Sequence, residues 1–277
     1  MDTLTPAILT FALVVAGLFG LVIGSFLNVV VYRVPAGVSL LRESRCPSCE
    51  APVKPWQNIP IVSWIALRGK CAACGAPISA RYPLVEAATA GAFVAVTWFA
   101  LEHGRALPLI AAIAVLIALL YLAAISIALT LIDLDTHRLP NAIVLPGYVV
   151  LAVLFLLACA FGAPWEALFR SLVGGAALFA FYFVLRLIRP GGMGGGDVKL
   201  AGVLGAALGW IGWSALIVGA FAAFVLGGVF GVALMIARRA GRKSAIPFGP
   251  WMIAGTWVGI FTGEQIARWY VGMLTAG

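Results

Sequence analysis

The chain has 277 residues, of which 63% are hydrophobic and 10% are charged, whereas a soluble domain carries about 45–50% apolar and 25% charged residues. This composition excludes a soluble globular protein, and so much aliphatic surface also excludes a disordered chain, a collagen and a coiled coil. The net charge of +8 does not indicate nucleic-acid binding, because the 18 Lys and Arg residues are scattered among loops between apolar runs. We therefore expect a protein that lies in the lipid bilayer and binds no nucleic acid.

Membrane-spanning helices need about 20 mainly apolar residues each, and eight runs of that kind are present. They cover residues 7–31, 84–101, 108–132, 142–162, 167–188, 198–216, 218–237 and 250–272. The last run is the least apolar, since Glu264, Gln265 and Arg268 interrupt it. Glycine pairs such as Gly174-Gly175 and Gly227-Gly228 predict close helix packing. The predicted fold is an all-α polytopic membrane protein with about eight transmembrane helices.

The basic residues predict how the chain is oriented in the membrane. When successive loops are assigned to alternate sides, 15 of the 18 Lys and Arg fall on one side, including Arg238, Arg239, Arg242 and Lys243. The other side keeps Arg105, Arg170 and Arg268. Because Lys and Arg collect in cytoplasmic loops, we expect both termini outside the cytoplasm and the long segment 33–83 inside it.

Four cysteines in segment 33–83 have the spacing of a metal site. Cys46, Cys49, Cys71 and Cys74 form the pattern C-x2-C-x21-C-x2-C, in which two tight turns present four thiolates to a structural zinc ion. Redox-active thiols are an alternative, whereas disulfides are disfavoured in the reducing cytoplasm. Cys159 lies alone in an apolar run and is expected to be a buried packing residue.

The predicted zinc site also divides the chain. A segment of about 50 residues with few large apolar side chains needs such a ligand to fold. We therefore expect a first transmembrane helix at 1–32, a cytoplasmic zinc-ribbon-like insertion at 33–83, and a transmembrane domain of about seven helices at 84–277.

Acidic residues are rare, and four of the ten lie near helix ends where they are costly: Glu86, Asp133, Asp135 and Asp197. The predicted topology places the three aspartates at the cytoplasmic ends of helices, and ionisable groups at such positions are functional candidates. The glycines before Asp197 would let a substrate backbone come close to its carboxylate. Alternatively, Asp197 caps the following helix and the glycines form a turn; the residues alone leave both interpretations open.

Several stretches together resemble the bacterial type IV prepilin peptidases, the leader peptidases of type IV pili and type II secretion. They are Gly24–Arg33, the two C-x-x-C pairs, Arg81–Glu86, Asp133–Asn141, Gly194–Leu200 and Pro247–Pro250, and the similarity covers nearly the whole chain.

The resemblance implies a membrane aspartic protease of the GxGD type in the bacterial inner membrane, with both termini in the periplasm. Its catalytic pair maps to Asp197 in Gly194-Gly195-Gly196-Asp197 and to Asp133, whose spacing to Leu139-Pro140 fits better than that of Asp135. Asn141 departs from the family pattern, in which many members have Asp, but leaves the catalytic pair untouched.

The resemblance also implies the substrates and a second activity. The substrates are prepilins or pseudopilins whose short basic leader ends in Gly before an apolar helix that lies in the bilayer. The family further implies N-methylation of the new amino terminus from S-adenosylmethionine, although the sequence has no Rossmann glycine fingerprint to mark a donor site.

Two adjacent carboxyl groups that share one proton supply both a base and an acid for amide hydrolysis. We expect Asp197, at a helix start, to be the base, and Asp133, at a helix end, to be the acid, because the helix dipole favours the ionised form at the start. The alternative function is a polytopic transporter or scaffold with a zinc-stabilised cytoplasmic loop, in which the aspartates relay protons.

Overall fold

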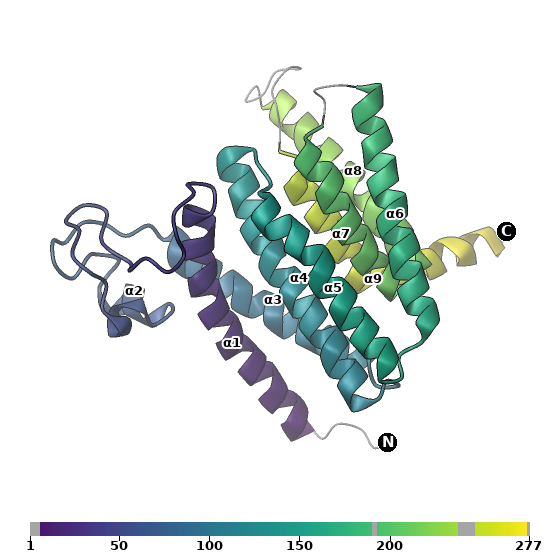
Figure 1. Ribbon diagram of the computed structural model, residues 1–277, viewed down its shortest axis with the longest axis horizontal. Coiled ribbons are helices and arrows are strands. Elements are labelled where there is room, and N and C mark those ends of the chain that lie inside the picture. Colours follow the sequence, from purple (N-terminus) through teal and green to yellow (C-terminus); the bar gives the residue numbers. More distant parts are fainter. Residues whose placement is uncertain (1–5, 190–192, 238–246, 276–277) are drawn as a thin grey trace. The chain divides into compact units, whose positions relative to one another are not determined.

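The computed structural model describes residues 6–189, 193–237 and 247–275. In this part of the chain the regular structure is helical, without strands (Figure 1). The helices are α1 (Pro6–Arg33), η1 (Pro55–Asn58, a 3-10 turn), α2 (Val62–Ala66), α3 (Arg81–His103), α4 (Leu109–Thr136), α5 (Asn141–Ala160), α6 (Trp165–Ile188), α7 (Gly195–Ile211), α8 (Trp213–Ile236) and α9 (Gly249–Thr275).

All eight predicted apolar runs are helical, which confirms the all-α membrane fold. Six of the long helices in the described residues, α1, α3, α4, α5, α6 and α8, are long and apolar enough to cross a membrane. Helix α7 has 17 residues and is therefore about 25 Å long, shorter than a hydrocarbon core of about 30 Å. Transmembrane placement of α7 and α9 stays a prediction, as does the side occupied by the basic residues between 238 and 243, which lie outside the described residues.

One predicted boundary is wrong. The runs 198–216 and 218–237 were separated near residue 217, whereas α7 ends at Ile211 and α8 begins at Trp213. The chain breaks at Gly212, whose backbone is extended. Because the residues on both sides of Gly212 are apolar, hydropathy does not reveal this break.

The chain forms two compact units, and α4 contributes residues to both. Unit 1 comprises Met1–Arg105 and Leu119–Ala128. In it, α1 packs along α3 at two glycines: a Cβ on Gly20 would lie 2.7 Å from the Cα of Ala90, and one on Gly24 would lie 2.7 Å from the Cα of Glu86. Only glycine permits so close an approach of two backbones.

Unit 2 comprises Ala106–Ala118 and Leu129–Gly277, and its helices α6 and α7 lie side by side, as do α8 and α9 (Figure 1). A Cβ on Gly205 would lie 2.4 Å from the carbonyl oxygen of Gly174, and Gly227 abuts the ring of Phe248. These contacts confirm the predicted glycine packing, except at Gly228, where an added Cβ would meet nothing within 4 Å. Cys159 is buried, as expected.

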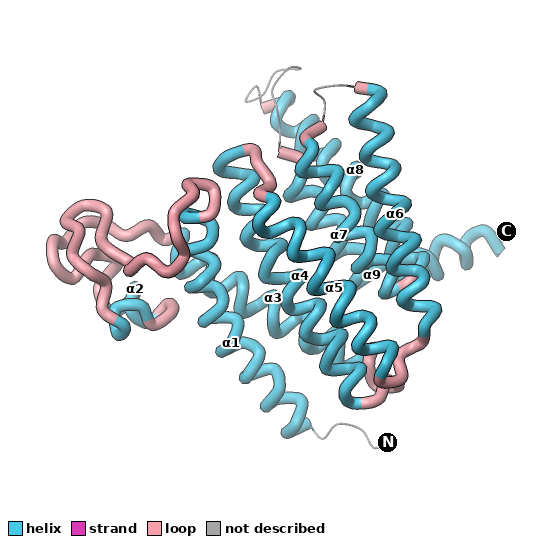
Figure 2. The backbone as a smooth tube through the Cα atoms, in the orientation of Figure 1, coloured by secondary structure: helices cyan, strands magenta, loops and turns pink. Residues whose placement is uncertain are grey.

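The residues between α1 and α3, 34–80, form what we call the cysteine segment. Figure 2 shows that most of it is loop, apart from η1 and α2. Two isolated antiparallel bridges, Arg45 with Pro52 and Lys70 with Pro77, each close a short loop. Each of these loops contains one C-x-x-C pair.

Candidate active site and metal centre

Asp133 lies in the last turn of α4 and is 4% exposed. The helix ends at Thr136, because His137 takes a left-handed conformation and its N–H donates to the carbonyl of Asp133. The Asp133 carboxylate accepts a hydrogen bond of 3.1 Å from the N–H of Gly249, the first residue of α9. A Cβ on Gly249 would lie 2.7 Å from that carboxylate oxygen, so glycine is needed for this approach.

Asp197 lies in the first turn of α7 and is partly buried. Its carboxylate accepts a hydrogen bond of 3.0 Å from the N–H of Gly194, which precedes the helix. The capping interpretation of Asp197 is therefore realised. Two of the glycines have an internal use as well: a Cβ on Gly195 would lie 2.6 Å from Arg186, and one on Gly196 would lie 2.8 Å from Leu139. Gly191 and Gly192 lie outside the described residues.

The structure brings the two aspartates into one site within unit 2. Leu139 lies close to both aspartates' neighbours. It packs against Gly196, which precedes Asp197, and it would lie 3.4 Å from a Cβ on Gly249, the residue that donates to Asp133. The negative charge of Asp133 acts on the carboxyl group of Asp197. Carboxyl groups whose charges influence one another are candidates for sharing a proton.

The helix dipoles act on the two aspartates less differently than the sequence predicts. Asp133 ends one helix, but it also receives the first N–H of α9, so it faces the positive end of a helix just as Asp197 does. The bond to α9 offsets part of the dipole difference, and the assignment of the base to Asp197 stays a prediction. Asp135 is exposed, in contrast to the buried Asp133.

Two aromatic residues near Asp197, Tyr182 and Tyr148, were not singled out from the sequence. Tyr182 on α6 is 2% exposed, and the charge of Asp197 acts on its phenol. On α7, Lys199 donates to the Asn141 side chain at 3.0 Å, and its carbonyl accepts from the hydroxyl of Tyr148 at 2.6 Å. These bonds join α5 to α7 within one turn of Asp197. Lys199 and Asn141 occur in the motif stretches, whereas an aromatic residue in an apolar run carries no signal.

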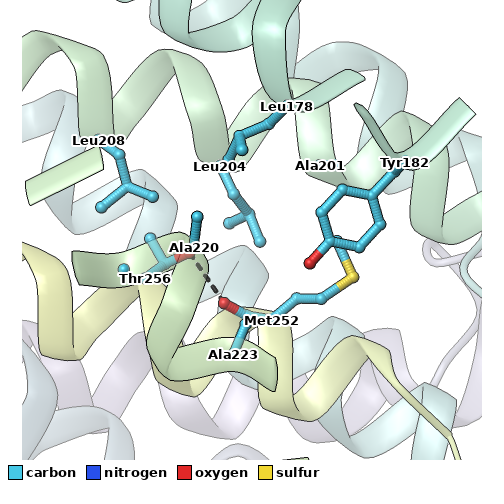
Figure 3. A pocket seen from close by; sticks show the side chains of 10 residues that line it. Leu178, Tyr182, Ala201, Leu204, Leu208, Ala220, Ala223, Met252 and Thr256 are labelled. Atoms are coloured by element: carbon cyan, nitrogen blue, oxygen red, sulfur yellow. Dashed lines mark hydrogen bonds between the residues drawn. The ribbon is translucent and has the colours of Figure 1, made fainter. Parts of the chain in front are cut away.

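A small cavity lies in the core of unit 2 between α6, α7, α8 and α9 (Figure 3). Tyr182 and Met252 face it from one side and Thr256 from another, while Ala201 lies one turn after Asp197. The Thr256 hydroxyl donates to the carbonyl of Met252. Because apolar and small residues dominate the lining and neither aspartate belongs to it, this cavity is a packing void next to the site.

The four cysteine sulfurs of unit 1 converge as the spacing predicts. Their Sγ atoms all lie within 4.8 Å of one another, and those of Cys46 and Cys74 are 3.9 Å apart. Four sulfurs placed tetrahedrally about 2.3 Å from a zinc ion would be separated by about 3.8 Å. The donor set therefore fits zinc in both kind and spacing.

The two C-x-x-C turns are built alike. The N–H of Cys46 donates to the carbonyl of Ala51, and that of Cys71 donates to the carbonyl of Ala76 in the same way. Backbone N–H groups of Ser48 and Cys49 lower the pKa of Cys46 to about 6. The first cysteine of each turn, Cys46 or Cys71, thus favours the thiolate that binds metal, whereas neighbouring thiols, chiefly Cys74, raise the pKa of Cys49.

Two buried charged residues hold the cysteine segment to its helices. Glu86, in α3, accepts a hydrogen bond of 2.7 Å from the N–H of Ile61. Arg33 ends α1 and is 7% exposed. Its guanidinium donates to the carbonyl oxygens of Ser39, Leu40, Arg42 and Glu43 and to the hydroxyl of Ser44. The residue type of Arg33 alone does not reveal that backbone carbonyls surround its guanidinium.

Comparisons with known proteins agree over nearly the whole chain. The model of the bacterial peptidase A24 N-terminal domain matches residues 18–100, and that of the type IV leader peptidase family matches residues 120–232. The prepilin leader peptidase/N-methyltransferase of Aeromonas hydrophila is 37% identical over 280 residues, covering 92% of each chain. The protein of that name from Bacillus subtilis is 33% identical, covering 92% of this chain and 96% of its own. No solved structure matches the chain.

Proposed function

The chain belongs to the prepilin leader peptidase/N-methyltransferase family, and from that premise we propose that Asp133 and Asp197 form its catalytic pair. In this proposal the enzyme removes the short basic leader of type IV prepilins or pseudopilins after a glycine, at the cytoplasmic membrane face, and methylates the new amino terminus. The observation that carries it is the convergence of Asp133 and Asp197 from α4 and α7 on one site. The transporter or scaffold alternative finds no support among the relatives.

The proposed reaction divides the two tasks of amide hydrolysis between the carboxyl groups. The ionised carboxylate takes a proton from a water molecule that attacks the scissile carbonyl carbon, and the protonated carboxyl gives its proton to the leaving amine. Gly249 and Gly194 each hold one carboxylate oxygen through a backbone N–H. These bonds orient the pair before substrate arrives. Cleavage should show two ionisations in its pH profile, and a profile with one would contradict the shared proton.

Orientation and domain division belong to the same proposal. The distribution of basic residues supports placing both termini in the periplasm and the region 33–83 in the cytoplasm. The prepilin helix would then lie in the bilayer beside unit 2, which brings its scissile bond to the depth of Asp133 and Asp197.

Both proposed cofactors belong to the family's two activities. The four thiols of Cys46, Cys49, Cys71 and Cys74 would hold a structural zinc ion, and with four protein ligands it would organise the segment rather than activate water. S-adenosylmethionine supplies the methyl group when bound. Its place in the chain is not marked by any motif, so methyl transfer rests on family membership.

Substitution of each aspartate in turn tests the catalytic pair. In proteoliposomes, Asp133→Asn and Asp197→Asn should each lower prepilin cleavage at least about 1,000-fold, since each removes one acid–base group from a pair. Asp135→Asn is the matched control, because Asp135 has the same charge two residues away but is exposed. Normal cleavage by either pair variant, or a comparable loss in the control, would overturn the assignment.

A further inference from the structure

The cysteine segment exposes four large apolar side chains on η1, on α2 and at the junction between them, which we name the apolar patch. Trp56 is 62% exposed, Ile59 49%, Val62 59% and Ile65 64%. Val62 and Ile65 are one helical turn apart and so share a face of α2. The buried Ser63 joins this helix to η1, because its hydroxyl accepts from the N–H of Ile59 and donates to the carbonyl of Trp56. Single exposed apolar residues are ordinary, but a cluster indicates a contact surface.

The depth of the patch follows from its bond to α3. Between Ile59 and Val62, the N–H of Ile61 donates to the buried carboxylate of Glu86 at 2.7 Å. Glu86 is the sixth residue of α3, about 7.5 Å along a helix that is long and apolar enough to span a membrane. The headgroup layer of one leaflet is about 5–7 Å thick. Ile61 and its apolar neighbours are thereby held beside the part of α3 that crosses this layer.

The backbone at this point is fixed tightly. Ile61 has φ 61° and ψ −49°, a conformation that is costly for a β-branched residue, and the N–H of Val62 donates to the carbonyl of Pro60 at 2.6 Å. This tight turn makes Ile59 and Val62 flank the residue that is bonded to α3. The hydrogen bond to Glu86 therefore fixes the position of the whole patch as well as that of the Ile61 N–H.

Charge indicates what the patch contacts. Residues 34–80 contain five Lys or Arg and two Glu. Two of the cations border the patch: Lys54 lies 5.2 Å above the ring of Trp56, and the exposed Arg68 follows Ile65 by three residues. The cytoplasmic leaflet is negatively charged and attracts such residues. A basic prepilin leader would be repelled by the same charges.

We propose that the apolar patch anchors the cysteine segment in the headgroup layer of the anionic cytoplasmic leaflet. Trp56, Ile59, Val62 and Ile65 insert between headgroups, while Lys54 and Arg68 bind lipid phosphates. The anchor rests on the cytoplasmic placement in the proposed function. It assigns the basic character of the segment to lipid binding rather than to substrate binding.

Hydrogen exchange of the full-length protein in nanodiscs tests this anchor. Amides of residues 56–66 should exchange at least about fivefold more slowly in discs with phosphatidylglycerol than in discs of phosphatidylcholine alone, because one Lys or Arg at an anionic surface is worth about that factor. Val62→Ser/Ile65→Ser should abolish the difference, and Arg68→Gln should reduce it. Leu41→Ser is the matched control, because Leu41 is 97% exposed in the same segment but lies outside η1 and α2.

Two results would overturn the anchor: equal exchange in both lipids, or an equal loss of protection in Leu41→Ser. Protection that appears only when a prepilin is added would also overturn it, because the prepilin would then be the occupant. Metal content of each variant shows whether the segment is still folded, and Val62→Ser alone replaces the double variant if that content falls. Prepilin cleavage by the parent in the same discs separates the proposals, since cleavage without lipid protection removes the anchor and leaves the peptidase.

Discussion

The cysteine segment and the helices that carry the aspartates are stabilised in opposite ways. The segment depends on a few polar contacts: four sulfurs, the carbonyl-lined Arg33 and the bond from Ile61 to Glu86. In unit 2, α6 to α9 depend on many apolar contacts made at glycines such as Gly205 and Gly255, where backbones meet. A segment without a core is therefore sensitive to the loss of one ligand, whereas a packed bundle is sensitive to one added methyl group.

Metal removal should have the largest effect, and it should unfold the cysteine segment while leaving the helices of unit 2 intact. A strong chelator should remove hydrogen-exchange protection from residues 42–78, because small zinc-stabilised folds are unfolded without metal. Exchange of α6 and α7 should not change. Cys46→Ser should lose the metal, whereas Cys159→Ser, at a cysteine outside the tetrad, should retain it. Unchanged protection after complete metal loss would show that the segment does not depend on zinc.

Gly249→Ala should have the second-largest effect, because it displaces the carboxylate of Asp133. The added Cβ would lie 2.7 Å from the Asp133 carboxylate, so the carboxylate must move, and a displacement of about 1 Å costs about 100-fold in rate. We expect that loss in prepilin cleavage with an unchanged melting temperature. Cleavage within twofold of the parent would show that the position of Asp133 is not critical.

Gly205→Ala should destabilise unit 2 by about 1–3 kcal/mol, because its Cβ would clash with the carbonyl oxygen of Gly174, a backbone atom that cannot turn aside as a flexible side chain can. Thermal unfolding in detergent measures this change. Gly228→Ala is the control, since its Cβ meets nothing within 4 Å. The control should melt at or slightly above the parent temperature. Equal effects at the two glycines would contradict packing as the source of stability.

Glu50→Gly should have the smallest effect and should strengthen the segment. Glu50 has φ 55° at the position where the second cysteine turn has Gly75, at φ 73°. Glycine removes the strain of a left-handed backbone conformation but loses more conformational entropy on folding. The net gain in the stability of the turn is about 0.5–1 kcal/mol. The chelator concentration that removes half of the metal should rise in Glu50→Gly and fall in Gly75→Ala. A fall in both would show that the Glu50 side chain stabilises its turn.

Much of the fold could be predicted, because spanning helices must satisfy their backbone hydrogen bonds internally and be apolar. All eight runs are helical for that reason. The break at Gly212 could not be located, since Ile211 and Trp213 on either side are as apolar as the helices they belong to. The partners of Arg33 and Glu86 could not be predicted either, because most of them are backbone atoms, which carry no residue-type signal.

The residues of the candidate site could be predicted from the sequence, but their contacts could not. The cysteine spacing and the two aspartate stretches led to groups that converge in space. The bond from Gly249 to Asp133 joins residues 116 positions apart and follows from the packing of α9. The sequence does not reveal this bond, which brings Asp133 a contact with the positive end of α9 in addition to its place at the end of α4.

The same bond has a consequence for biosynthesis. Chains leave the ribosome amino terminus first, so Asp133 and Asp197 have been translated before Gly249. Asp133 gains the Gly249 partner only when α9 has been made, and until then the candidate aspartate site of the nascent polypeptide is incomplete.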